Sequence, residues 1–73
     1  MMNDIPTLLN SKNKHENVKL TDLDNDLIYA LPAPRGRWTL NSLATIVTLY
    51  TQDIGSEGWN VFLKNRLIAT SEL

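Results

Sequence analysis

The leucines of residues 20–31 recur every three or four positions, which is the spacing of one helix face. They are Leu20, Leu23, Leu27 and Leu31. Thr21 is a favourable N-cap, and the aspartates that follow it suit the positive end of a helix dipole. Pro32 cannot continue a helix, so the pattern predicts a first helix over residues 20–31.

A second apolar stripe runs through residues 39–51, after a loop that contains two prolines and a glycine. Thr39 is a favourable N-cap for a helix here. The apolar residues that share its face are Leu40, Leu43, Ala44, Val47 and Tyr50. The competing interpretation is a strand over residues 45–51, which are rich in β-branched and aromatic side chains. The helix is preferred because the pattern begins earlier and runs longer than a strand requires.

A third helix is predicted to begin near Ser56, after a turn at residues 52–55. Its apolar face consists of Trp59, Phe62, Leu63 and Leu67. Three amphipathic helices with short connections predict an all-α fold, a small three-helix bundle. The expected core consists of Leu23, Leu27, Leu43, Val47, Trp59, Phe62 and Leu63. A strand at residues 45–51 would instead make the fold α+β.

Residues 1–18 show neither helical nor strand periodicity and are rich in asparagine. The chain is therefore divided into a flexible N-terminal arm, residues 1–18, and a single helical domain, residues 19–73. One short apolar cluster lies in the arm beside Pro6: Ile5, Leu8 and Leu9. The arm is interpreted either as a plain tail or as a segment that becomes ordered on a partner.

Length and composition exclude several classes of function. A chain of 73 residues is one domain at most, with a core too small to house a deep active site. The absence of cysteine excludes disulfides, thiolate zinc sites and thiol catalysis. No apolar run approaches the ~20 residues of a membrane span, and the N-terminus lacks a signal-peptide pattern. A cytoplasmic location without a membrane partner is expected.

Catalysis is not expected either. The only histidine, His15, falls in the predicted arm as a solvated side chain, whereas acid–base catalysis requires a group held in place. Residues 22–26, Asp-Leu-Asp-Asn-Asp, resemble the opening of a calcium-binding EF-hand loop. Leu27 and Ala33 then occupy the positions where that loop needs glycine and glutamate, so a solvated acidic helix start is preferred. We predict a protein that is not an enzyme, with no cofactor, metal or small-molecule substrate.

The basic and aromatic loop of residues 32–38 is the strongest candidate for a binding surface. It presents Arg35, Arg37 and Trp38 from a segment stiffened by prolines, and arginine and tryptophan dominate many protein interfaces. The alternative is that Trp38 anchors the loop in the core while the arginines are solvated. The predicted partner-binding residues are these three together with Ile5, Leu8 and Leu9 of the arm.

DNA is the less favoured partner. The second and third predicted helices could form a helix-turn-helix unit, with the third as the recognition helix. However, its early positions include Glu57 and no cation. The net charge of −1, from seven Lys and Arg against eight Asp and Glu, also lacks the basic excess of phosphate-binding domains.

A cysteine-free chain of this size, with an asparagine-rich arm, a loop carrying Arg35, Arg37 and Trp38, and no catalytic group, resembles the small bacteriophage proteins that bind host RNA polymerase. The resemblance implies a regulator of transcription initiation or termination that acts in the host cytoplasm through a protein partner. The direction of regulation and the oligomeric state stay open.

Overall fold

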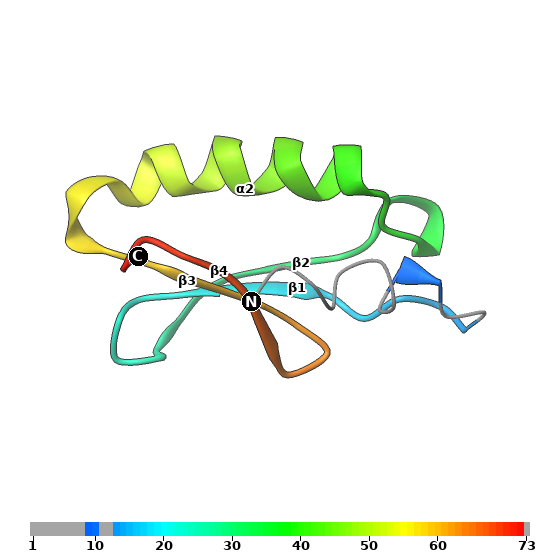
Figure 1. The fold of residues 1–73 in the computed structure, drawn as a ribbon, viewed down its shortest axis with the longest axis horizontal. Coiled ribbons are helices and arrows are strands. Elements are labelled where there is room, and N and C mark those ends of the chain that lie inside the picture. Colours follow the sequence, from blue (N-terminus) through cyan, green and yellow to red (C-terminus); the bar gives the residue numbers. More distant parts are fainter. Residues whose placement is uncertain (1–8, 11–12, 73) are drawn as a thin grey trace.

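The computed structural model describes residues 9–10 and 13–72. The described chain folds as two β-hairpins joined by one long helix (Figure 1). Its elements are β1 (Val18–Thr21), β2 (Leu27–Leu31), the short 3-10 helix η2 (Pro34–Gly36), α2 (Leu40–Ile54), the 3-10 helix η3 (Gly55–Glu57), β3 (Asn60–Leu63) and β4 (Arg66–Thr70).

The strands form one antiparallel sheet in the order β2-β1-β3-β4, and α2 lies across one face of it (Figure 1). The prediction of an all-α three-helix bundle is therefore wrong, and the fold is α+β. The alternative of a strand at residues 45–51 is wrong as well, because these residues lie within α2. The strands come instead from the two segments that were predicted as the first and third helices.

The first predicted helix is a hairpin because Asp22 organises a turn after β1. Its Oδ1 accepts the backbone N–H groups of Asp24 and Asp26, each at 2.9 Å. Asn25 adopts a φ of 66°, a left-handed conformation that asparagine tolerates better than most residues. Aspartate side chains bond to nearby backbone more readily in turns than inside helices, so the chain reverses where leucine spacing alone predicted a helix.

The third predicted helix is a hairpin because Lys64 and Asn65 form a two-residue turn. Both have positive φ, 55° and 62°, the combination that matches the twist of two antiparallel strands. Gly58 precedes this hairpin with a φ of 92°, and a Cβ at this position would lie 2.5 Å from Leu23 Cδ1. Glycine at this position therefore allows the two hairpin ends to pack closely together.

The predicted second helix is confirmed. Thr39 is its N-cap, and its side chain accepts the backbone N–H of Ser42 at 3.1 Å. The Ser42 hydroxyl accepts the backbone N–H of Thr39 in return, at 2.8 Å, which completes a capping box. The helix continues three residues beyond the predicted end, to Ile54.

Strand periodicity decides which side chains form the core. Residues that alternate along the central strands β1 and β3 are buried between the sheet and α2, while Lys19 and Phe62 lie on the opposite face. The buried apolar core consists of Val18, Leu20, Trp38, Leu43, Val61, Leu63 and Ile68. Of the predicted core, Leu43 and Leu63 are confirmed, whereas Leu23 and Leu27 are exposed.

The folded body begins before residue 19. Val18 is fully buried in β1, and His15 is 9 % exposed, so the prediction of a solvated histidine is wrong.

None of the helices in the described part of the chain is long and apolar enough to cross a membrane.

Candidate functional site at the cationic end

The charged side chains are sorted between the two ends of the sheet. The cations of the described residues flank the start of β1, the end of β3 and the loop after β2, which the register brings together at one end. They are Lys14, Lys19, Arg35, Arg37, Lys64 and Arg66. We call this the cationic end; Glu16 is the one described carboxylate side chain that accompanies them.

The remaining described carboxylates lie at the other end, around the β1–β2 turn, the end of α2 and the end of β4. They are Asp22, Asp24, Asp26, Asp53, Glu57 and Glu72. We call this the anionic end; no lysine or arginine of residues 9–10 and 13–72 belongs to it. The net charge of −1 therefore conceals a strong charge separation.

Helix α2 reinforces this separation. It begins at Leu40, directly after the cationic loop, and ends at Ile54 near the anionic end. A helix carries about half a positive charge at its N-terminus and half a negative charge at its C-terminus. Its first turn holds no acidic residue and its last turn no basic one, so neither terminus is compensated within the helix. The dipole adds to the potential of both ends.

The loop that carries the arginines is held by His15 and Trp38. The backbone N–H of His15 donates to Gly36 O at 2.8 Å, and the backbone N–H of Trp38 donates to His15 Nδ1 at 2.7 Å. The indole Nε1 of Trp38 donates to Glu16 O at 2.9 Å. These bonds fasten the loop to the segment before β1, so Lys14 and the arginines are presented from a rigid base.

Arg35 and Arg37 lie where the predicted binding loop placed them. Both are exposed, and they line a shallow hollow of about 490 Å³ together with Lys14 and Gly36. Arg37 Nη2 also donates to Leu9 O at 3.2 Å. Lys14 belongs to the predicted arm, yet the structure places it in the same cluster as the loop arginines.

The other predicted partner-binding residues have different positions. Trp38 is only 2 % exposed and belongs to the core, so it supports the loop from below. Leu9 is half-buried and packs against the core cluster. Ile5 and Leu8 lie outside the described residues. The structure thus brings Arg35 and Arg37 together, with Trp38 beneath them.

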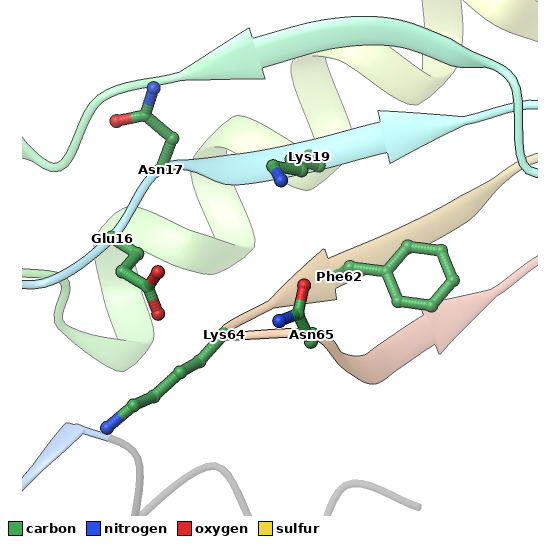
Figure 2. A pocket seen from close by; sticks show the side chains of 6 residues that line it. All are labelled: Glu16, Asn17, Lys19, Phe62, Lys64 and Asn65. Carbon is green, nitrogen blue, oxygen red and sulfur yellow. The ribbon is translucent and has the colours of Figure 1, made fainter.

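A second hollow, of about 300 Å³, opens on the sheet face away from α2 (Figure 2). Its lining comes from the start of β1, from β3 and from the β3–β4 turn: Glu16, Asn17, Lys19, Phe62, Lys64 and Asn65. Lys19 and Phe62 are direct cross-strand partners. Sequence reasoning missed this site because it assigned Phe62 to a helical core; the alternation of Val18, Lys19 and Leu20 was the available signal.

A groove of different character lies between α2 and the edge strand β4. It has a volume of about 430 Å³, and its lining is largely apolar: Leu40, Leu43, Ala44, Val47, Thr48, Ile68 and Ala69. Leu40 is 60 % exposed there.

The anionic end contains one perturbed titratable group, Tyr29 of β2. Its hydroxyl donates a hydrogen bond to Asp53 Oδ2, and its ring meets that of Tyr50 edge to face at 4.9 Å between centroids. The hydrogen bond to the Asp53 carboxylate raises the pKa of Tyr29 above 10.0, with smaller contributions from desolvation and from the carboxylate charge.

The imidazole of His15 is engaged through Nδ1 with the backbone, and its Nε2 is buried. Within the described residues, no group of three or more His, Cys, Asp or Glu side chains is arranged to hold a metal ion.

The chain matches no family model, and neither curated proteins nor solved structures gave a significant match.

Proposed function

We propose that this chain is a non-enzymatic binding protein that docks on an acidic macromolecular surface through its cationic end. The observation that carries the proposal is the charge separation: Lys14, Arg35 and the neighbouring cations lie at one end of the sheet, and every described carboxylate side chain except Glu16 lies at the opposite end. Such a dipolar protein is attracted in one orientation, because its anionic end is repelled by the same partner.

The partner predicted from the sequence, bacterial RNA polymerase in the host cytoplasm, stays a prediction. A transcribing polymerase carries both protein surface and nucleic acid, so it offers acidic groups of both kinds. A helix-turn-helix unit is not formed, because the residues predicted as its recognition helix form the strands β3 and β4.

The test is a pair of variants with the same net charge. In the cationic-end variant, Lys14→Gln and Arg35→Gln remove two exposed cations of the loop cluster. In the control variant, Gln52→Glu and Ser56→Glu add two carboxylates at exposed positions of the anionic end. Wild type and both variants are then compared by their salt of elution from immobilised heparin, a polyanion, and by the proteins and nucleic acids that each retains from a bacterial lysate.

We expect the control variant to behave like wild type, and the cationic-end variant to elute from heparin at lower salt and to lose the retained partner. Equal behaviour of the two variants would show that only net charge matters, and the proposal would then be wrong. Circular dichroism of each variant verifies that the fold is retained.

A further inference from the structure

The face of the sheet away from α2 combines an aromatic ring with cations. Phe62 is half-buried in the middle of β3, and Lys19 of the neighbouring strand is its direct cross-strand partner. Both side chains project from the open face, because the residues that alternate with them are buried under the helix. No other described helix or strand covers this face.

Polar side chains line the rest of this hollow, and the phenyl ring of Phe62 lies at one side of it (Figure 2). Lys64 extends from the β3–β4 turn and points away from the ring, Asn65 lies close to Phe62, and Asn17 lies at the start of β1. Amides both donate and accept hydrogen bonds, so they can pair with the edge of a nucleobase. Ammonium groups attract phosphates without demanding a fixed geometry. The hollow therefore offers a stacking surface, base-edge partners and phosphate partners within about 300 Å³.

We propose that this open face binds single-stranded nucleic acid, with a base stacked on Phe62, the adjacent phosphates on Lys19 and Lys64, and the strand continuing onto the loop of Lys14 and Arg35. The inference rests on the proposed function and names the class of the acidic partner. Proteins that bind single strands without strong sequence preference combine stacking aromatics with a cationic track in the same manner.

A single strand fits this surface better than a duplex or an acidic peptide. The bases of a duplex are already stacked on each other, so a ring on a flat sheet has no base to receive. An acidic peptide would use the lysines but would gain nothing specific from the ring and the amides. Glu16 repels phosphate within the hollow, yet its carboxylate can accept a hydrogen bond from the exocyclic amino group of a cytosine.

The test is fluorescence anisotropy of a labelled thymine oligonucleotide about ten nucleotides long, at about 50 mM salt. Competitors are the same strand paired into a duplex, and polyglutamate as the acidic-peptide probe. The variants are Phe62→Leu, which removes the ring but keeps an apolar strand residue, and Phe62→Tyr, which keeps the ring. Lys64→Gln removes one phosphate partner.

We expect the single strand to bind, and Phe62→Leu to weaken it about tenfold, as loss of one stacked base would. Phe62→Tyr should bind like wild type. Lys64→Gln should lower the slope of log affinity against log salt by roughly 0.7, the value for one phosphate on a single strand. The duplex and polyglutamate should compete poorly.

Absence of strand binding at low salt would overturn this inference, as would a Phe62→Leu variant that binds as tightly as wild type. If polyglutamate competes as well as the strand does and Phe62→Leu changes nothing, the partner is an acidic protein. In that case the heparin and lysate comparison of the two matched-charge variants still decides the proposed function on its own.

Discussion

The two ends of the sheet are stabilised by different kinds of side chain. At the anionic end a charged group forms part of the fold, because the Asp22 carboxylate accepts two backbone N–H groups of its own loop. At the cationic end the corresponding bonds are made by the uncharged groups of His15 and Trp38. The lysines and Arg35 there are not required to close the loop. Charge is thus a structural element at one end and is available to a partner at the other.

This comparison predicts that the free energy of unfolding is most sensitive to substitution at the anionic end, where Gly58 packs closely against Leu23. We expect Gly58→Ala to destabilise the fold by about 2–4 kcal/mol, because the new Cβ meets Leu23 Cδ1 at 2.5 Å and φ is 92°. A domain of this size is stabilised by only about 3–5 kcal/mol, so most of its stability would be lost. Urea denaturation followed by tryptophan fluorescence measures the change.

Gly55→Ala is the matched control for this prediction. Gly55 also has a positive φ, 71°, but no atom lies within 4 Å of the position its Cβ would occupy. It should therefore cost only the backbone strain, on the order of 1–3 kcal/mol, and less than Gly58→Ala, which adds the close contact with Leu23. Adding Leu23→Ala to Gly58→Ala should recover part of the loss. If the two glycine variants are equally destabilised, close packing of the hairpins does not hold this end together.

The leucine spacing of residues 20–31 shows why the first hairpin was predicted as a helix. Leu20, Leu23, Leu27 and Leu31 satisfy helical spacing, yet Leu20 is buried in a strand and Leu27 is 59 % exposed. The decisive signals were turn-forming residues: Asp22 with Asn25, and the pair Lys64 and Asn65. The N-cap of α2 was predicted correctly, because a capping box is a local interaction that involves only Thr39 and Ser42.

The candidate site was predicted only where its residues are close in sequence. Arg35 and Arg37 were recognised in one loop, whereas Lys14 and Lys64 reach the same end through the pairing of β1 with β3. Such pairing is a long-range property that one sequence does not reveal. Net charge was misleading for the same reason, because it sums two ends that the fold keeps apart.

A smaller effect is expected from the uncharged anchor of the cationic end. His15→Phe removes the Nδ1 acceptor and leaves the backbone N–H of Trp38 buried without a partner. The unpaired N–H should lower the free energy of unfolding by about 1–2 kcal/mol. The loss is no larger because the change also removes the buried Nε2, which has no hydrogen-bond partner among the described residues. The free energy of unfolding measured in urea gives the cost.

His15→Asn is the control, because its side-chain oxygen can accept the Trp38 N–H in place of Nδ1. Phenylalanine fills the volume without an acceptor, and asparagine keeps an acceptor without the volume. If the Phe variant is as stable as wild type, the bond between His15 and Trp38 does not hold the loop. The comparison of the two ends would then lose its basis at the cationic end.

The smallest effect is expected at high pH, from Tyr29 and Asp53. The hydrogen bond to the carboxylate raises the pKa of Tyr29 above 10.0, so the folded state favours the neutral hydroxyl more strongly than the unfolded chain does. This contribution to stability is present below pH 10 and is lost as the pH rises through the raised pKa. Wild type should therefore lose more stability between about pH 9 and 12 than Tyr29→Phe does.

All other titratable groups are common to both proteins, so their effects cancel in the difference between the two curves. Melting temperatures of wild type and Tyr29→Phe across this range isolate the tyrosine. Converging curves at high pH mean that Asp53, like Asp22, is a carboxylate used by the fold, which extends the structural role of charge at the anionic end. Parallel curves would mean that the bond between Tyr29 and Asp53 stabilises nothing, and Asp22 alone would then distinguish the two ends.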